Sequence, residues 1–198
     1  RDHVVLCGIG HLGYRVMQQL IQSNIQVVAL EKDEHCRFME PTQAAGVPVL
    51  IHDMTNDKAL IEAGVPHARA IIVATNNDMA NLEVALDARR MNPNIRILMR
   101  LYDQQIASKI AGSLSIDAAF SASALAAPVV AAMSLDTEVL SSFMIDGSTY
   151  VNAQVKIDAT SSLLGSSISQ IEARHKARVL AHFSGPARHI PPQSDATV

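Results

Sequence analysis

The chain has 198 residues, a formal net charge of −3 at pH 7 and a hydrophobic content of 48%. This length accommodates one domain, or one domain and a fragment, and the apolar content is ample for a core. The charge argues against a nucleic-acid-binding surface, which is usually strongly basic, and no apolar run approaches the ~20 residues of a membrane span.

The termini and the cysteines indicate a cytoplasmic protein that extends upstream. No secretory signal is visible. The two cysteines, Cys7 and Cys36, form no disulfide framework, which fits a reducing compartment. Residue 1 is Arg rather than Met and an apolar run begins almost at once, so we expect the natural protein to continue beyond this end.

The opening stretch carries the strongest motif of the chain. An apolar run at residues 4–7 leads directly into Gly8-Ile9-Gly10-His11-Leu12-Gly13, and a helical pattern follows. Three spaced glycines between a strand and a helix are the context of the dinucleotide fingerprint. Gly8 would allow the tight turn, Gly10 would let the backbone approach a phosphate, and Gly13 would let the helix pack on the strand. The helix start then favours an anion, with His11 as a loop residue over the phosphates rather than a general base.

A second apolar run ends in a carboxylate at the position that the fingerprint requires. Residues 25–30 lead to Glu31, about twenty residues after the glycines, where the ribose-binding acid belongs. A carboxylate there prefers a free 2′-hydroxyl and repels a 2′-phosphate, which favours NAD or an adenine nucleotide over NADP. Lys32 would offset this preference if it turned inward. The alternative is an ordinary solvated acid at a strand end.

Strands and helices then alternate with short loops. Strands are expected at residues 47–51, 70–74, 95–99 and 116–120, and helices at 33–45, 57–63, 79–91 and 104–111. This alternation predicts an α/β fold, a Rossmann-like doubly wound parallel sheet of about six strands. Ligands bind such sheets outside the carboxyl ends of the strands. Six candidate residues fall at those ends: Gly10, Glu31, Asp53, Thr75, Asn76 and Arg100.

The pattern changes after the sixth strand. Residues 121–135 form an Ala-rich helix whose apolar stripe has few charges around it, and this stripe needs cover from its own domain or a second subunit; it consists of Leu125, Val129, Val130 and Met133. A hairpin is expected from residues 142–145 and 150–157 around Asp146-Gly147-Ser148, then a short helix to residue 172 and a strand at 177–183. These elements predict a crossover helix and a truncated, partial small α+β lobe.

Residues 1–135 resemble the RCK (regulator of K⁺ conductance) domain, also called the Trk-type NAD-binding domain. The matching runs are residues 7–13, 60–65, 70–75, 77–78, 81–82, 92–93, 97–100 and 116–117. Residues 138–198 look more loosely like the first part of the C-terminal RCK lobe, with residues 164–168 as the clearest match. The resemblance implies two parts: residues 1–135 as the nucleotide-binding N-lobe with its crossover helix, and 136–198 as a partial C-lobe.

The resemblance implies a ligand-sensing module on the cytoplasmic face of a membrane and no enzymatic activity. Its regulatory ligand would be NAD(H) or ADP/ATP, and it would gate a potassium channel or transporter on the same or another chain. Gating would act through rearrangement of a subunit interface in a homo-oligomer, a dimer that can assemble into an octameric ring. No nucleic-acid partner is implied.

By position, the resemblance also assigns the nucleotide contacts. The glycines face the phosphates, Glu31 faces the ribose, and Arg100 lies near the phosphates or the partner subunit. The full expected set is Gly8, Gly10, His11, Leu12, Gly13, Glu31, Lys32, Asp53, Met54, Ala74, Thr75, Asn76 and Arg100. In this set Asp53 and Met54 would flank the adenine, and residues 74–76 would lie beneath the ribose.

Four residues depart from the family pattern. His11 stands where several members have an Arg that meets terminal phosphates, and His52 stands where members often have Gly. Ser121 and Ala122 stand where members that read a partner's nucleotide often have Glu. These departures weaken ATP as the ligand more than NAD or ADP.

Two alternatives to this interpretation are an enzyme fragment and a metal site. A fragment of a soluble NAD-dependent oxidoreductase would need an acid or base near the nicotinamide, but the eight histidines are scattered without a catalytic pairing. A metal site is conceivable from His175, His182 and His189, or from Asp136 with Glu138. The spacing of seven residues between those histidines matches no common ligand pattern, so a solvated face is expected and no metal site.

Overall fold

The chain divides into two units, Arg1–Ala131 and Ala132–Val198. The computed structural model describes residues 2–113, 116–133, 138–145, 148–185, 187–190 and 193–195. Asp136, a conceivable metal ligand in the alternative set aside above, and the turn residues Asp146 and Gly147 lie outside these ranges. Across the described ranges, no helix combines the length and apolarity that crossing a membrane requires.

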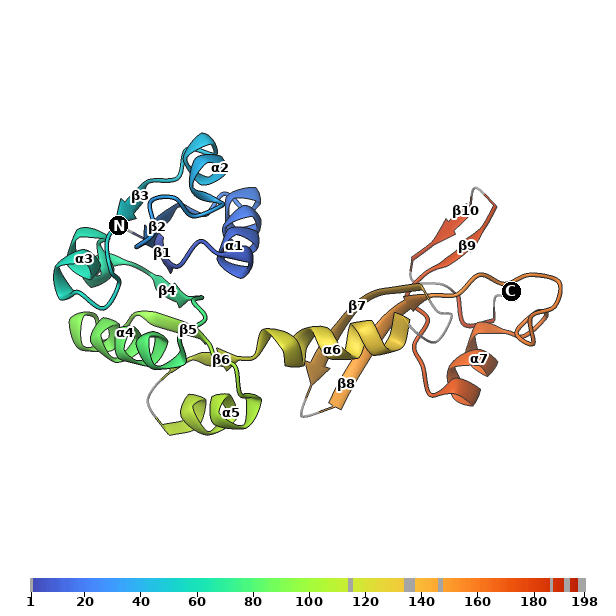
Figure 1. Ribbon diagram of the computed structural model, residues 1–198. Helices are drawn as coiled ribbons and strands as arrows, with labels where there is room; N and C mark the ends of the chain where they lie inside the picture. Colours follow the sequence, from blue (N-terminus) through green and yellow to red (C-terminus); the bar gives the residue numbers. More distant parts are fainter. Residues whose placement is uncertain are drawn as a thin grey trace. The chain divides into compact units, whose positions relative to one another are not determined.

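Unit 1 is built on a six-stranded sheet in which every neighbouring pair is parallel. The strand order is β3-β2-β1-β4-β5-β6, the doubly wound order of a Rossmann fold, and it confirms the predicted fold class. The strands are β1 (Val4–Cys7), β2 (Val27–Glu31), β3 (Val49–Ile51), β4 (Ala70–Val73), β5 (Arg96–Arg100) and β6 (Ala118–Phe120). The order reverses between β1 and β4, which places the topological switch point beside the glycine motif (Figure 1).

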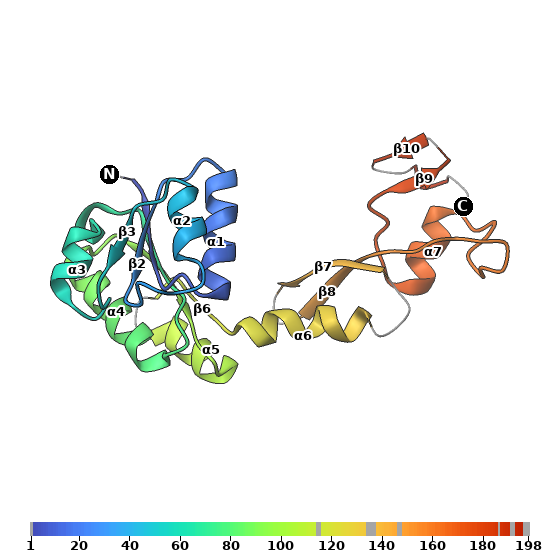
Figure 2. The ribbon, with the colours of Figure 1, turned by 45° about the horizontal axis from the view of Figure 1, so that its top comes forward.

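Helices cover both faces of this sheet (Figure 2). Alternate strand residues point to opposite faces, so Leu6 joins the core under α1 and α2 whereas Val5 and Cys7 join the core under α3, α4 and α5. Burial raises the pKa of the Cys7 thiol to about 12, so this thiol stays protonated at neutral pH. The helices are α1 (His11–Gln22), α2 (Met39–Ala44), α3 (Asp57–Glu62), α4 (Asp78–Met91) and α5 (Gln104–Ser113), with a 3₁₀ turn η1 (Val65–His67) before β4.

The helix after β2 begins later than the sequence predicts. Asp33 was expected to cap a helix, but its Oδ1 accepts the His35 N–H at 3.0 Å and closes a turn instead. Short polar side chains compete with the helix in this way. Cys36 therefore lies before α2, and Pro41 falls in the first turn of the helix, where its missing N–H removes no intrahelical bond.

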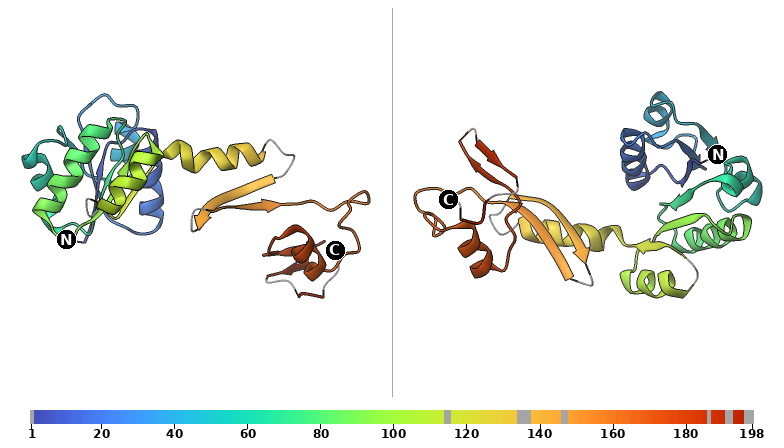
Figure 3. Two further views of the ribbon diagram at one scale, coloured as in Figure 1. Left: turned by 90° about the horizontal axis from the view of Figure 1, so that it is seen from below. Right: turned by 180° about the vertical axis from the view of Figure 1, so that it is seen from behind.

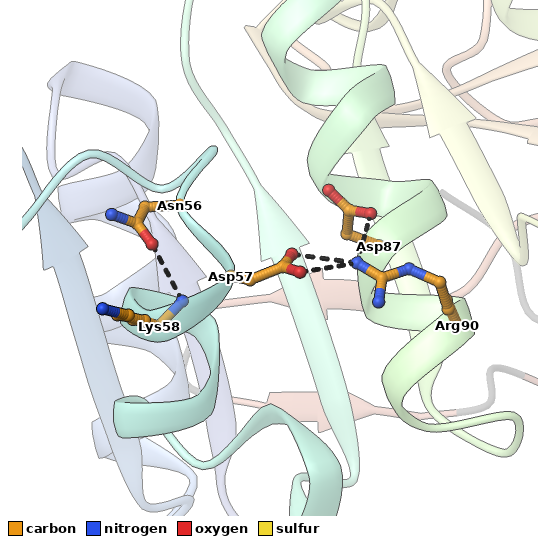
Figure 4. Close-up of polar contacts among 5 residues, drawn as sticks. All are labelled: Asn56, Asp57, Lys58, Asp87 and Arg90. Carbon is orange, nitrogen blue, oxygen red and sulfur yellow. Dashed lines mark hydrogen bonds and ion pairs between the residues drawn. The ribbon is translucent and has the colours of Figure 1, made fainter.

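Salt bridges fasten α3 to α4 on one face of the sheet (Figure 4). The Asn56 side chain caps α3 by accepting the Lys58 N–H at 2.9 Å. Arg90 Nη2 reaches both oxygens of Asp57 at 2.9 Å and an oxygen of Asp87 at 2.8 Å. All three side chains are solvent-accessible, so this network fixes geometry more than it adds stability.

Unit 2 begins at the end of α6 (Ala122–Met133) and contains two antiparallel hairpins. In the first, β7 (Glu138–Ile145) pairs with β8 (Ser148–Gln154), which confirms the expected hairpin. A capping box between Ser167 and Gln170 starts α7 (Ile168–His175). The strand predicted at residues 177–183 is wrong, since β9 (His182–Ser184) begins only at His182 and pairs with β10 (Ala187–His189), which the sequence did not indicate (Figure 3, dark red).

Asn81 joins the carboxyl ends of β4 and β5. Its side chain is fully buried, and its Nδ2 donates to the carbonyl oxygens of Thr75 and Arg100, both at 3.0 Å. Its Oδ1 accepts the Thr75 hydroxyl. One amide thus satisfies backbone groups that strand pairing leaves open at the switch point.

Substitution of Asn81 by Ala should destabilise unit 1 strongly. Two half-buried carbonyls and one hydroxyl would lose the Asn81 side chain as their hydrogen-bond partner, at an expected cost of about 2–4 kcal/mol in the free energy of unfolding. Chemical denaturation measures this loss. Asn77→Ala is the matched control, because it removes only the cap that accepts the Ala80 N–H and should cost about 1 kcal/mol. Equal losses in the two variants would contradict this role for Asn81.

Candidate nucleotide-binding site

The three motif glycines have different physical roles. Gly8 has a φ of +88°, and a Cβ there would lie 2.8 Å from Thr75 Cγ2. A Cβ on Gly13 would lie 1.9 Å from the carbonyl oxygen of Gly8. A Cβ on Gly10 would meet no atom within 4 Å. Gly8 and Gly13 are therefore required by the fold, whereas the absence of a side chain at Gly10 keeps space open at the start of α1.

The first turn of α1 faces this open space. Gly10 is the N-cap and supplies no side chain to the free N–H groups of the turn, while its carbonyl accepts the Tyr14 N–H at 2.9 Å. Helix N-termini leave N–H donors without intrahelical partners and carry a partial positive charge. The arrangement can receive an anionic group such as a phosphate.

Glu31 is anchored against the glycine loop. Its Oε2 accepts the Ile9 N–H at 3.0 Å, and its Oε1 accepts the N–H groups of Lys32 at 2.9 Å and Asp33 at 3.2 Å. An ionised carboxylate has about four acceptor positions, so backbone donors occupy most of them. Glu31 is thus held in place beside the α1 N-terminus, with acceptor capacity left for a hydroxyl of a ligand.

The loop after β3 forms a self-contained turn. Asp53 Oδ1 accepts the Thr55 N–H at 3.0 Å and its hydroxyl at 2.9 Å. These two bonds hold the pKa of Asp53 below its ordinary value, and the charge of Lys32 acts in the same direction. The His52 N–H donates to the Glu31 carbonyl at 3.0 Å, which ties this turn to β2. Met54 packs against the core shared by α3 and α4.

The loop after β4 lies across the switch point from the glycines. Ala74 is buried and its N–H donates to the Cys7 carbonyl at 2.9 Å. Thr75 contacts the Gly8 position and is fixed by Asn81, whereas Asn76 is exposed. Arg100 ends β5, and its carbonyl accepts a hydrogen bond from the Asn81 side chain.

An aromatic cluster beside α1 was not foreseen. The Phe38 ring stacks on Tyr14 at 4.6 Å and meets the edge of His11 at 5.0 Å, and the Arg37 guanidinium lies 5.6 Å from its centroid. Phe38 lies at a position expected inside a helix, so its pattern gave no signal of this contact. The cluster brings Arg37 to the region of His11 and the first turn of α1.

The structure brings most of the expected residues together. Gly8, Gly10, Gly13, Glu31 and Thr75 meet at the switch point through the contacts above. His11 and Leu12 open α1, and Lys32 follows Glu31. Asp53 is linked to this group through the loop after β3, and Asn76 and Arg100 lie at neighbouring strand ends. Asn81 fixes the loops on one side of this group, a role that the sequence does not indicate beyond its place in the matching run 81–82.

Comparison with known proteins places this geometry in a family. Residues 4–122, more than half of the chain, match the TrkA-N domain family. The chain belongs to the TrkA-N domain family. The recognition made from the sequence is therefore confirmed.

Curated relatives of this TrkA-N protein are named as potassium channels and uptake proteins. Potassium channel protein 1 of Methanocaldococcus jannaschii is 27% identical over 99 residues, covering 50% of this chain and 30% of the relative. A Trk system potassium uptake protein TrkA homolog of Pyrococcus horikoshii is 29% identical over 101 residues, covering 51% and 44%. The chain thus spans less than half the length of these relatives.

Solved structures share the fold at low sequence identity. The GsuK channel bound to NAD has a TM-score of 0.67 at 14% identity, over 100% of this chain and 35% of that one. GsuK bound to ADP has a TM-score of 0.57 at 22% identity, over 67% and 33%. The AMP-bound Kef CTD of Shewanella denitrificans has a TM-score of 0.57 at 19% identity, over 68% and 82%.

Two glycine substitutions should separate stability from the open site. Gly13→Ala places a Cβ against a backbone oxygen, so α1 must shift, at an expected cost of about 1–3 kcal/mol in the free energy of unfolding. Gly10→Ser should leave this free energy unchanged or raise it slightly, because the site is open and Ser is a favoured N-cap. Thermal or urea unfolding compares the two. A Gly10→Ser variant that is as unstable as Gly13→Ala would contradict these separate roles.

Proposed function

We propose that this chain is a nucleotide-sensing regulatory domain that binds NAD(H) or an adenine nucleotide and gates a potassium channel or transporter. The observation that carries the proposal is the anchored Glu31 beside the uncapped start of α1, at the switch point of a TrkA-N fold. The names of the curated relatives support potassium transport as the process. The NAD, ADP and AMP named for the structural neighbours support the ligand class.

In this proposal each part of the ligand meets one element of the site. The phosphates lie on the first turn of α1, where Gly10 lets them approach the backbone, and Glu31 accepts a hydrogen bond from a ribose hydroxyl. The Glu31 carboxylate disfavours a 2′-phosphate, so NAD binds more tightly than NADP. Asp53, Met54 and residues 74–76 line the base and ribose. Arg37 supplies positive charge beside the phosphates, and His11 lies next to it at the start of α1.

The ligand acts as a signal rather than a substrate in this proposal. Residues 1–135 form the nucleotide-binding lobe with its crossover helix, residues 136–198 form part of a second lobe, and the pore lies on the same or another chain. Binding changes the angle between subunits on the cytoplasmic side of the membrane, a rigid-body rearrangement of the kind that gates assemblies.

An exposed apolar stripe on α6 supports self-association. Leu125, Val130 and Met133 are 53%, 66% and 62% exposed in the single chain, and the helix sequence 122–133 contains no charged residue. Covering apolar surface is favourable by about 25 cal/mol per Å². A two-fold dimer is the commonest closed arrangement for such a surface, and it supplies the subunit pair that the proposed gating requires.

Nucleotide binding should depend on Glu31 and on the open space at Gly10. Glu31→Ala removes a charge-assisted hydrogen bond to ribose, so the dissociation constant for NAD or ADP should rise about ten- to hundredfold. Gly10→Ser should weaken nucleotide binding by about tenfold or more, because the serine side chain occupies the approach to the backbone. The free energy of unfolding of this variant should stay that of the unmodified chain. Isothermal titration calorimetry measures both constants.

The matched control for Glu31 is Glu34→Ala, since Glu34 is exposed and pairs with His35. It should bind NAD as the unmodified chain does, and a competition titration should rank NADP below NAD. Unchanged NAD affinity in both Glu31→Ala and Gly10→Ser would contradict the proposed site.

Self-association should depend on the apolar stripe of α6. Val130→Asp places a charge in the covered surface and should convert the dimer to a monomer at tens of micromolar, because burial of an unpaired carboxylate is unfavourable. Sedimentation velocity reports the change. Ala127→Asp is the control: Ala127 lies on the same helix away from the centre of the stripe and should leave the dimer intact. A monomeric unmodified chain, with and without NAD, would rule out the proposed dimer.

A further inference from the structure

We propose that His182 and His189 form a binding site for an imidazole-preferring transition-metal ion, such as Zn²⁺ or Ni²⁺, across the β9–β10 hairpin. The site lies in unit 2 and is independent of the proposed nucleotide site. The seven-residue spacing matches no metal motif in the sequence, but the hairpin register brings the two residues together.

The register places both side chains on one face of the hairpin. His182 and His189 are directly opposed partners in the antiparallel pairing of β9 and β10. Opposed residues of an antiparallel pair project to the same side and interact. Their ring centroids lie 6.2 Å apart with an interplanar angle of 29°.

This separation is close to that of two imidazoles on one ion. Zn–N bonds of about 2.0–2.1 Å in tetrahedral geometry place two ligand ring centroids about 5 Å apart. The χ2 torsion of histidine is broad, so modest rotations turn a nitrogen of each ring toward a common point. Rotation of the two rings and a decrease of about 1 Å in the distance between their centroids would therefore form the site.

One imidazole nitrogen of the pair lacks a hydrogen-bond partner among the described residues. His182 Nδ1 is buried and has no hydrogen-bond partner within the described part of the chain. Buried polar atoms are nearly always paired. Among the described contacts, no hydrogen bond therefore fixes the His182 ring by this atom.

The donor set selects the class of metal. Imidazole nitrogen suits Zn²⁺, Cu²⁺ and Ni²⁺, whereas Ca²⁺ and Mg²⁺ take oxygen ligands. No group of three or more His, Cys, Asp or Glu residues gathers among the residues that the structure describes. The ion would therefore be held by two protein ligands, with water or a group from another molecule at its remaining positions.

Metal binding would stabilise the hairpin that holds it. β9 and β10 have three residues each, and an isolated two-stranded hairpin is marginally stable in water. An ion that binds only the paired strands shifts the equilibrium toward pairing. The proposed site is thus a cross-strand clamp on a weak element.

Calorimetric titration of the full tag-free chain with Ni²⁺ and Zn²⁺ tests the proposal. The unmodified chain should bind either ion at this site, and His182→Gln and His189→Gln should each weaken that binding about tenfold or more, because a single imidazole loses the benefit of two linked ligands. His175→Gln is the matched control, since His175 ends α7 outside the hairpin, and it should bind as the unmodified chain does. Mg²⁺ should not bind this site.

Hydrogen exchange of residues 182–189 supplies a second measurement. Ni²⁺ should slow exchange there in the unmodified chain and in His175→Gln, and should have no effect in His182→Gln or His189→Gln. Because His189 is exposed, its substitution keeps the test valid if His182→Gln disturbs the hairpin. Absence of Ni²⁺ binding, unchanged affinity in both hairpin variants, or an equal loss in His175→Gln would overturn the proposal.

Discussion

The close approach of α1 to the loop after β1 is the constraint on which the rest of unit 1 depends. With only hydrogen atoms on Gly13, the first turn of α1 packs against the Gly8 carbonyl. This contact holds the positive end of the helix directly over the carboxyl end of β1. It also leaves the Ile9 N–H facing Glu31, so the helix terminus and the carboxylate reach the same place through one backbone contact.

A second set of contacts ties the other half of the sheet to this point. Asn81 holds the strand ends at Thr75 and Arg100 together, and the Asp78 carboxylate accepts the Tyr102 N–H at 2.9 Å and 3.1 Å. The start of α4 therefore organises the loops after both β4 and β5. The site is shaped by backbone groups that are fixed by buried or half-buried side chains.

The sequence predicted the sheet well because its signals are local. An apolar run such as residues 70–73 is typical of a strand in a parallel sheet that is covered on both faces. The Gly-rich turn indicates which loop meets the helix. Contacts that depend on strand register, or on side chains far apart in the sequence, leave no comparable pattern in the sequence. The Asp33 turn, the Phe38 cluster and the β9–β10 pairing all arise from competition or pairing that residue type alone does not reveal.

The candidate site shows the same division. Glu31 could be placed at a strand end from its spacing, but its three backbone donors could not be foreseen, since they depend on how the loops close around it. The sequence gives no sign of Arg37 at the site, because its pattern predicts a helix at residues 33–45, whereas Arg37 lies before α2. Spacing thus predicts which residues come near a ligand, and the loop geometry determines how much bonding capacity each one has left.

The unequal roles of the three glycines bear on how this sequence can drift over evolutionary time. Gly8 and Gly13 are required by the backbone conformation and by close backbone contacts, so any descendant that keeps the fold must keep them. No such contact constrains Gly10, and a side chain there would matter only to a molecule that occupies the space before α1. On the proposed function, a lineage that no longer bound the nucleotide would retain the outer two glycines while the middle position accumulated side chains, and that pattern among descendants would record where binding was lost.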